Sequence, residues 1–143
     1  MMKSIALALA LVSTSAMAAS EIIMHRDPGC GCCEKWAAQV RAKFGRTVKV
    51  VNDADRTALH KKLGMPAGLT SCHTAIIDGI AFEGHVPIED MKRVLASKPK
   101  GVRGLAVAGM PIGSVGMEAP GYPSDHYNVI AFGSGKPTVF AKH

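Results

Sequence analysis

The sequence lacks the features on which several common functions depend. Aromatic residues make up only 5% of the 143 residues, and none are interleaved with lysine and arginine as in a nucleic-acid platform. The glycines of residues 101–121 lack the Lys-Ser or Lys-Thr of a phosphate loop, and His-Glu-x-x-His is absent. No Ser/His/Asp nucleophile constellation, internal repeat or linker stands out. We therefore expect a single domain that binds no nucleic acid, and we interpret its net charge of +6 as a solvated surface.

Long apolar runs are also missing. The unbroken run from Ile5 to Val12 is shorter than the roughly 20 residues that span a bilayer. Lys3 precedes this run, and Ala16-Met17-Ala18 follows it with the small-x-small pattern of a cleavage site. The order of these features predicts a signal peptide over residues 1–18 rather than a buried N-terminal helix. We expect export to the periplasm, no stable membrane insertion, and one metal-binding domain over residues 19–143.

Cysteine is scarce, and its distribution is uneven. Three of the four cysteines lie in Cys30-Gly31-Cys32-Cys33, and the fourth is Cys72. A disulfide framework usually joins distant loops, because longer closed loops gain more stability. The clustering therefore indicates chemistry at one place, although a simple stabilising disulfide remains an alternative. A thiolate at a helix N-terminus could attack a disulfide or hold a metal, and the Cys-x-x-Cys spacing alone does not decide between them.

The order of predicted elements favours an α/β fold. Apolar periodicity, Gly and Pro signals and the Asp78-Gly79 turn predict strand, helix, strand, helix, hairpin and helix in that order. This order is typical of a thioredoxin-like core, a βαβ unit plus an antiparallel hairpin with flanking helices. We expect residues 101–121 to form a glycine-rich loop without regular structure, and a C-terminal β-hairpin to follow. The expected elements are Glu21 to His25, Cys32 to Phe44, Thr47 to Val51, a helix ending near Leu63, Thr74 to Phe82, a helix after Pro87, Tyr127 to Phe132 and Thr138 to Ala141.

The expected fold brings candidate metal ligands together. In a thioredoxin-like arrangement Cys72 lies beside the first helix N-terminus, and three or four converging sulfurs select Cu(I), Zn(II) or an iron–sulfur cluster. The methionines of the glycine-rich loop lack the spacing of a buried face, and thioether sulfur suits Cu(I) better than zinc. Packing of this loop onto the domain is the alternative role for these methionines. The candidate metal ligands are Cys30, Cys32, Cys33, Cys72, His73, His85, Met110 and Met117.

Four motifs resemble those of the bacterial domain-of-unknown-function four-one-one family. They are Asp27-Pro28-Gly29-Cys30-Gly31-Cys32-Cys33 with Trp36, Ser71-Cys72-His73-Thr74, Glu83-Gly84-His85-Val86-Pro87, and Gly109-Met110-Pro111 to Gly116-Met117-Glu118. The resemblance covers essentially all of residues 19–143. It implies a periplasmic metal-binding protein associated with copper or cation resistance. Val115 stands where the family usually has proline, which leaves both methionines in place.

The sequence and the resemblance together favour a non-enzymatic role in copper homeostasis. We expect Cu(I) to be bound, sequestered or delivered by ligand exchange, with another periplasmic copper-handling protein as a partner. The first alternative is a thiol–disulfide oxidoreductase with Cys30 as attacking thiolate and Cys33 as resolving thiol. The second is a structural zinc site in a protein of unrelated function. A homodimer that shares the cysteine cluster is compatible with the sequence.

Overall fold

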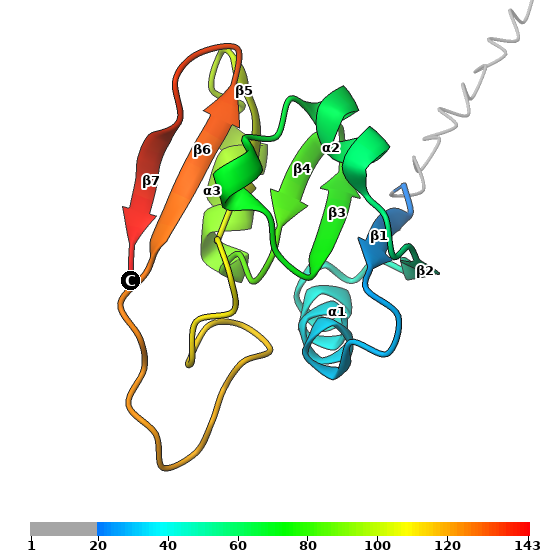
Figure 1. Cartoon of the computed structure of the whole chain (residues 1–143), viewed down its shortest axis with the longest axis vertical. Helices are drawn as coiled ribbons and strands as arrows, with labels where there is room; N and C mark the ends of the chain where they lie inside the picture. Colours follow the sequence, from blue (N-terminus) through cyan, green and yellow to red (C-terminus); the bar gives the residue numbers. More distant parts are fainter. Residues whose placement is uncertain (1–19) are drawn as a thin grey trace, which may run out of the picture.

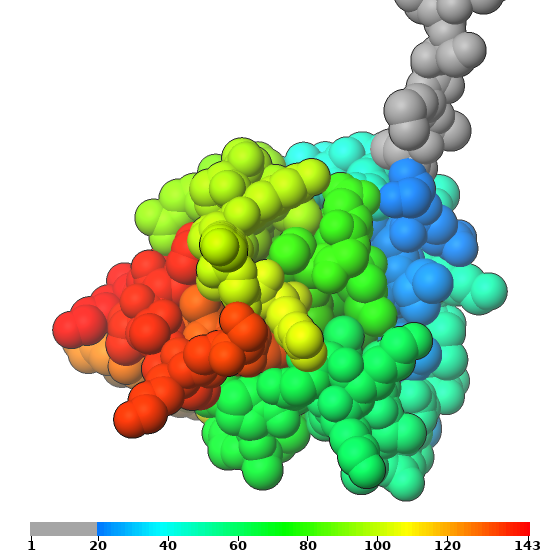
Figure 2. All heavy atoms as spheres, turned by 90° about the horizontal axis from the view of Figure 1, so that it is seen from above, coloured from blue at the N-terminus to red at the C-terminus, as the bar shows by residue number. Residues whose placement is uncertain are grey.

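One mixed sheet organises the part of the chain that the structure describes. The computed structural model describes residues 20–143, so the predicted signal peptide lies outside it. The strands follow the order β2-β1-β3-β4-β5-β6-β7, with β1 and β2 at one side of the molecule and the C-terminal hairpin at the other (Figures 1 and 2). The strands are β1 (Ile22–Arg26), β2 (Val48–Asn52), β3 (His73–Ile77), β4 (Ile80–Glu83), β5 (Val102–Ala106), β6 (Asn128–Gly133) and β7 (Thr138–Lys142).

Three α-helices and one short 3-10 helix connect the strands. They are α1 (Gly31–Phe44), α2 (Thr57–Leu63), η1 (Ala67–Leu69) and α3 (Ile88–Ser97). The α1 connection joins the parallel pair β1 and β2, which confirms the predicted βαβ unit. Within residues 20–143, no helix combines the length and the apolar character that a membrane crossing requires. The predicted mixed α/β architecture is therefore present.

Helix α1 is capped by a cysteine at its N-terminus and by a glycine at its C-terminus. The Cys30 sulfur accepts a hydrogen bond from the Cys33 backbone N–H at 3.3 Å, so a cysteine sulfur occupies the N-cap position. At the other end Gly45 adopts φ +62°, the left-handed conformation that glycine takes without steric cost. Trp36 and Val40, one helical turn apart, are both buried against the sheet. The sequence-predicted helix over residues 32–44 is confirmed within one residue at its start.

The hairpin between β3 and β4 turns at the dipeptide that the sequence indicated. Asp78 has φ +49° and Gly79 has φ +82°, so both central residues have the positive φ of a type I′ turn. The strands then pair antiparallel from Ile77 with Ile80 to Thr74 with Glu83. This register places the start of β3 opposite the end of β4.

Alternating side chains divide the core between the two faces of the sheet. Phe82, Leu105 and Ala131 join the cluster that contains the buried residues of α1 and α3. Their chain neighbours point to the opposite face and pack against the segment of α2 and η1, because successive strand residues alternate between faces. These neighbours are Ala81, Ala106 and Phe132, which contact Leu63, Met65 and Leu69.

The expectation that residues 101–121 form only a loop is wrong for its first part. β5 pairs parallel with β4 and antiparallel with β6. Gly104 allows this pairing, because a Cβ there would lie 2.4 Å from the Ala81 carbonyl oxygen and 2.4 Å from the Phe132 ring. The glycine content that suggested a loop thus includes a close approach of backbone and ring inside a strand.

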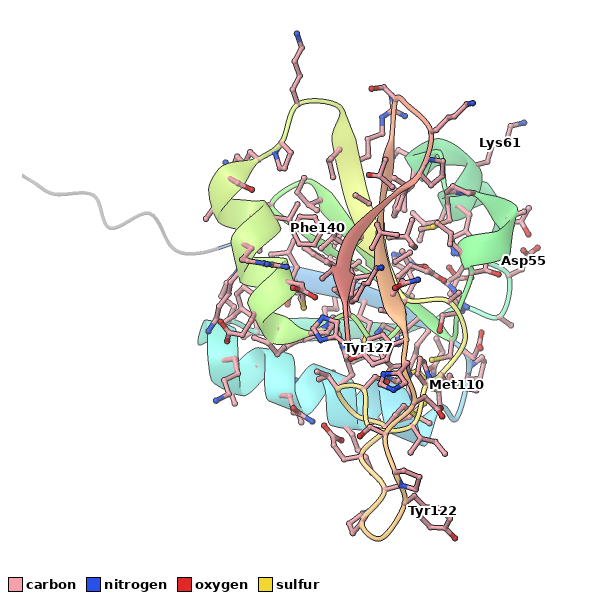
Figure 3. All side chains as sticks on the ribbon, turned by 90° about the vertical axis from the view of Figure 1, so that its left-hand side faces the viewer. Asp55, Lys61, Met110, Tyr122, Tyr127 and Phe140 are labelled. Carbon is pink, nitrogen blue, oxygen red and sulfur yellow. A yellow bond between two sulfur atoms is a disulfide. The ribbon has the colours of Figure 1, made fainter. Side chains whose placement is uncertain are left out.

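The rest of the glycine-rich segment is an ordered loop between β5 and β6. Ile112 and Asp125 close the loop at its base: the Asp125 N–H donates to the Ile112 carbonyl at 2.9 Å, and the Ile112 N–H donates to Asp125 Oδ2 at 2.8 Å. Beyond this neck the loop extends to an exposed tip at Tyr122 (Figure 3). Met110 lies on the other side of the neck, close to the N-terminus of α1.

Candidate metal centre

The candidate ligands meet because four chain segments pass the same end of the sheet. β1 runs antiparallel to β3, and Arg26, the last residue of β1, pairs with His73, the first residue of β3. The cysteine cluster after β1 is therefore next to Cys72, and the Asp27 N–H donates to the Cys72 carbonyl at 3.0 Å. β4 and β5 also end here. β4 leads to His85, and β5 leads to the loop over residues 107–127, which carries Met110 and Met117 and is called the methionine loop below. The sequence-predicted approach of Cys72 to the cysteine cluster is confirmed.

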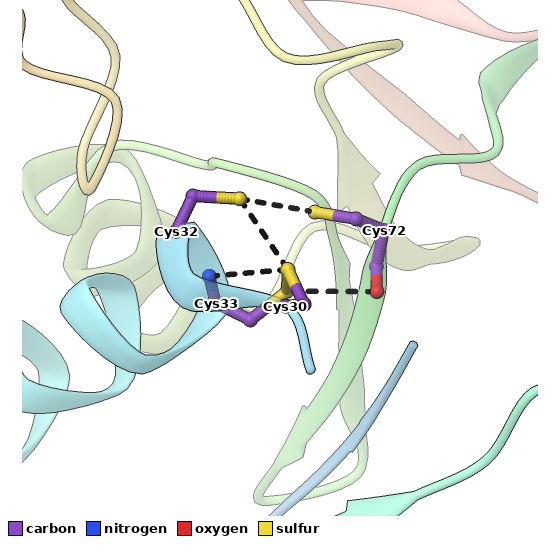
Figure 4. A group of neighbouring side chains, drawn as sticks. All are labelled: Cys30, Cys32, Cys33 and Cys72. Atoms are coloured by element: carbon purple, nitrogen blue, oxygen red, sulfur yellow. Dashed lines mark hydrogen bonds between the residues drawn. A yellow bond between two sulfur atoms is a disulfide. The ribbon is translucent and has the colours of Figure 1, made fainter. Parts of the chain in front are cut away.

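The sulfur atoms of Cys32, Cys72 and Met110 converge in front of α1, and Figure 4 shows the two cysteine sulfurs among them. Cys32 Sγ lies 4.0 Å from Cys72 Sγ and 3.9 Å from Met110 Sδ. Two sulfurs held tetrahedrally by one ion at about 2.3 Å lie about 3.8 Å apart. The spacing of these three sulfurs therefore fits shared coordination of a soft ion.

The other two cysteines form a disulfide. Cys30 and Cys33 are bonded to each other, and Cys32 Sγ lies 3.3 Å from Cys30 Sγ. In this state Cys30 and Cys33 offer no thiolate, so a four-cysteine ligand set requires the disulfide to be reduced. The bond closes a loop with a sequence separation of only 3 residues, which gives little chain-entropy stabilisation. Its location therefore favours a role at the site over a purely stabilising one.

His85 presents one ring nitrogen to Cys72. Its Nε2 lies 3.3 Å from Cys72 Sγ, and its Nδ1 lies 2.8 Å from the Val115 carbonyl oxygen. A carbonyl only accepts, so Nδ1 carries the proton and Nε2 has its lone pair free towards the sulfur. Histidine ligands are commonly oriented by such a bond from the second nitrogen. Because Val115 contributes its backbone carbonyl, a proline at this position would keep the same acceptor.

His73 is enclosed beside the same thiol. Its Nδ1 lies 3.5 Å from Cys72 Sγ, and its ring packs 4.6 Å from the Trp36 ring centroid. His73 Nε2 is buried and finds no hydrogen-bond partner among the described residues. Burial, together with the nearby His85 and Arg56, lowers the pKa of His73 to about 3. The imidazole is therefore neutral at physiological pH, which is the form that binds metals.

The electrostatics of the metal-free site keep its groups uncharged. Burial, and then the neighbouring Cys32, raise the pKa of the Cys72 thiol to about 12. Burial also lowers the pKa of His85, against the opposing effect of its bond to Val115. A thiol must lose its proton to become a metal ligand, so binding at Cys72 is coupled to proton release. A bound cation would supply the charge that stabilises the thiolate in this buried setting.

The structure separates the two loop methionines. Met110 is 52% exposed and contacts Cys32 through its sulfur. Met117 is half-buried, and among the described residues the thioether that accepts a hydrogen bond from a cysteine thiol is that of Met110 and not that of Met117. Its backbone instead closes a turn, with the Gly113 N–H donating to the Met117 carbonyl at 3.0 Å. The geometry therefore supports Met110 as a direct donor more strongly than Met117.

Residues 20–143 contain two overlapping groups of Cys and His donor atoms that could hold a metal. Cys72 belongs to both groups, so it is the central donor of the site. The predicted residues that the structure brings together are Cys30, Cys32, Cys33, Cys72, His73, His85 and Met110.

Gly116 is a contact residue that the sequence analysis treated only as loop punctuation. It has φ +85°, and a Cβ there would lie 2.8 Å from both the Cys32 carbonyl oxygen and the Trp36 backbone nitrogen. The methionine loop therefore rests directly on the first turns of α1.

The sequence analysis also missed two buried charged residues beside Ser71, which are Arg56 and Glu83. The one available signal was the charge of Glu83 at the end of the apolar run Ile80–Phe82.

Comparisons with known proteins identify one family model and two solved structures that are similar to this chain. The family model described as "Protein of unknown function, DUF411" matches residues 69–117. The solved structure titled "Copper resistance protein copG- Form 1" is 39% identical, with a TM-score of 0.79, covering 88% of this chain and 98% of that one. A second structure of the same title, Form 2, is 40% identical with a TM-score of 0.77, covering 86% and 97%. No curated protein sequence gives a significant match. Together with the motifs and the shared fold, these matches show that the chain belongs to the DUF411 family.

Proposed function

We propose that this protein binds Cu(I) in the periplasm and sequesters or delivers it, without catalysing a reaction. The observation that carries the proposal is that the Cys32 sulfur lies 4.0 Å from the Cys72 sulfur and 3.9 Å from the Met110 sulfur. Thiolate and thioether donors together favour Cu(I), because a thioether contributes little to zinc binding. The two similar structures are of a copper resistance protein, which supports the same metal.

The burial of the donors suggests how the ion would be exchanged. Cys72 and both histidines are buried, whereas Met110 is 52% exposed at the edge of the site. A partner protein's sulfur could replace Met110 first, while the buried donors still hold the ion. This order supports delivery by ligand exchange to another copper-handling protein.

The periplasmic location depends on the signal-like residues 1–18. The sequence β1-α1-β2, followed by β3, β4 and α3, supports the proposed thioredoxin-like core.

The test is a Cu(I) competition titration against a chromogenic chelator, on reduced protein kept free of oxygen. We expect stoichiometric, tight binding, and at least about a 100-fold loss of affinity in Cys72→Ser. The loss of a buried thiolate ligand should cost more than the 10–100-fold loss typical of an outer partner, and more than the loss of the exposed, neutral Met110 thioether. Failure of the wild type to compete, with its thiols shown to be reduced, would contradict the copper proposal. Preferential binding of Zn(II) would instead favour the zinc alternative.

The two methionines supply a matched pair for this titration. Met110→Leu is expected to weaken Cu(I) binding about 10-fold, because it removes the sulfur 3.9 Å from Cys32. Met117→Leu keeps a similar volume and is expected to have a smaller effect. Equal losses in the two variants would show that the loop rearranges to bring both thioethers to the ion.

A second candidate function is thiol–disulfide exchange, and the disulfide itself favours it. Cys30 is half-buried and Cys33 fully buried, which suits an accessible attacking sulfur and a protected resolving one. We expect the protein to reduce insulin no faster than a dithiol reagent alone. Faster reduction that is lost in Cys30→Ser, with Cu(I) affinity retained, would instead establish the oxidoreductase function.

A further inference from the structure

Two buried charged side chains hold the residue that precedes Cys72. The Ser71 N–H donates to Glu83 Oε1 at 2.6 Å, and the Ser71 carbonyl accepts from Arg56 Nη2 at 2.8 Å. Glu83 is fully buried, and Arg56 is only 8% exposed. Both backbone polar groups of one loop residue are therefore bound by charged side chains, each from a different element.

The same two side chains also reach the other side of Cys72. Glu83 Oε2 accepts a hydrogen bond from the Thr74 hydroxyl, two residues after Cys72, and lies 3.3 Å from His60 Nε2. Arg56 Nη1 donates to Asp27 Oδ1 at 2.6 Å, and the Asp27 N–H bonds the Cys72 carbonyl. The backbone around Cys72 is thus fixed from the β4 side by Glu83 and from the α2 side by Arg56.

Ser71 has no room to move away from this arrangement. A Cβ on Gly84 would lie 2.7 Å from Ser71 Cβ, so the loop lies directly on the turn after β4. The Ser71 hydroxyl donates to the Gly109 carbonyl, next to Met110. The residue that Glu83 and Arg56 hold therefore connects Cys72 to the methionine loop.

Stability does not explain why two charged groups are buried here. Apolar residues of similar volume often replace buried ionic groups with no loss of stability, whereas fixing the conformation of bound groups is the better-attested use of such residues. A buried carboxylate that accepts two hydrogen bonds allows its partners only a narrow range of positions. Glu83 and Arg56 bind the backbone of Ser71, the residue before Cys72, so this rigidity bears directly on the position of the central candidate donor.

We propose that Glu83 and Arg56 are positioning residues of the metal site, which hold the Cys72 sulfur facing Cys32 and His85. This inference rests on the proposed function, because its main measure is metal affinity. Neither residue is hydrogen-bonded to a candidate donor atom: Glu83 acts through the Ser71 N–H and the Thr74 hydroxyl, and Arg56 acts through the Ser71 carbonyl and the Asp27 carboxylate. Outer partners that orient a ligand commonly account for 10–100-fold in metal affinity.

The test compares three carboxylate variants in the Cu(I) competition titration. Glu83→Leu, which removes the acceptor while keeping the volume, is expected to bind Cu(I) 10–100-fold more weakly and to have a lower melting temperature, because the Ser71 N–H and the Thr74 hydroxyl lose their acceptor. Glu83→Gln retains an oxygen for the Ser71 N–H and is expected to recover most of the affinity. Asp90→Asn is the control, because Asp90 is a buried carboxylate bonded to Arg93 and His143 and not to any residue of the site.

A metal-free measurement separates this inference from the proposed function. In Glu83→Leu the Ser71 amide should shift upfield in the NMR spectrum and exchange faster, while the amides in the middle of β3 and β4 stay protected. If Glu83→Leu does not fold, Arg56→Met removes the hold on the Ser71 carbonyl and takes its place in the titration. A folded variant that binds Cu(I) as tightly as the wild type overturns the inference. If the wild type binds no Cu(I), the proposed function fails, and an unchanged Ser71 amide then overturns the positioning role as well.

Discussion

Replacing Gly116 with alanine is expected to lower the free energy of unfolding by about 2–6 kcal/mol and to weaken Cu(I) binding. A non-glycine residue at φ +85° costs about 1–3 kcal/mol, and the new methyl group would collide with the backbone of Cys32 and Trp36, adding a packing cost of about 1–3 kcal/mol. Relief of this collision requires the loop to move off α1. Met110 and the Val115 carbonyl move with the loop, so binding weakens together with stability. Urea denaturation and the Cu(I) titration measure the two effects.

Gly109→Ala is the matched control for this substitution. Gly109 also has a positive φ, +69°, but a Cβ there would meet no heavy atom within 4 Å. Only the backbone cost of about 1–2 kcal/mol is expected, with little change in Cu(I) affinity. Equal losses in Gly109→Ala and Gly116→Ala would contradict the contact between the loop and α1.

Acid is expected to destabilise the metal-free protein by about 2 kcal/mol between pH 7.5 and pH 5 through His73 alone. The pKa of His73 is lowered to about 3 by burial, so the folded protein cannot take up a proton that the unfolded chain binds below about pH 6.5. The contribution of His73 is complete above pH 6.5, and it is lost as the pH falls towards 3. Each pH unit in this window costs up to about 1.4 kcal/mol.

Urea denaturation of the wild type and His73→Gln at several pH values isolates this effect. The pKa of the neighbouring His85 is also lowered, so His85 too makes the folded protein less stable as the pH falls. Burial raises the pKa of Glu83, so this group makes the folded protein more stable as the pH falls. The difference between the two proteins removes both contributions. His126→Gln, on the exposed loop, controls for the loss of one histidine from the unfolded chain. Parallel pH curves for the wild type and His73→Gln would contradict a buried neutral imidazole.

The sequence predicted the elements whose signals are local. The Asp78-Gly79 turn and the end of the first helix at Phe44 were predicted correctly, because both follow from residue type over a few positions. The approach of Cys72 to the cluster was also predicted, although it depends on the antiparallel pairing of β1 with β3 and thus on the expected topology. β5 was missed because its pairing requires partners far along the chain and because Gly104 reads as a loop residue.

The finer features of the site have no comparable sequence signal. Met110 and Met117 look equivalent in a glycine-punctuated run of sequence. Only the fold of the loop places the Met110 sulfur, and not the Met117 sulfur, beside Cys32. Arg56 lies in an ordinary polar stretch before α2, so nothing in its neighbours predicts a bond to Ser71. The pairing of Cys30 with Cys33 is the one that the oxidoreductase alternative implied, but the Cys-x-x-Cys spacing alone does not decide between a disulfide and a metal site. Features that depend on tertiary contacts of single side chains were thus beyond prediction from the sequence.

The neck formed by Ile112 and Asp125 gives the two sides of the long loop different tolerance to a change in chain length. Residues added beside Tyr122 would enlarge a ring that is already closed at its base, and doubling the length of such a ring costs only about 0.6 kcal/mol in closure entropy. A single residue added between β5 and the neck would instead displace Met110 from Cys32. Insertions such as an epitope or a fluorophore should therefore be accommodated at the tip, and among related chains the variation in loop length should gather there, away from the donors.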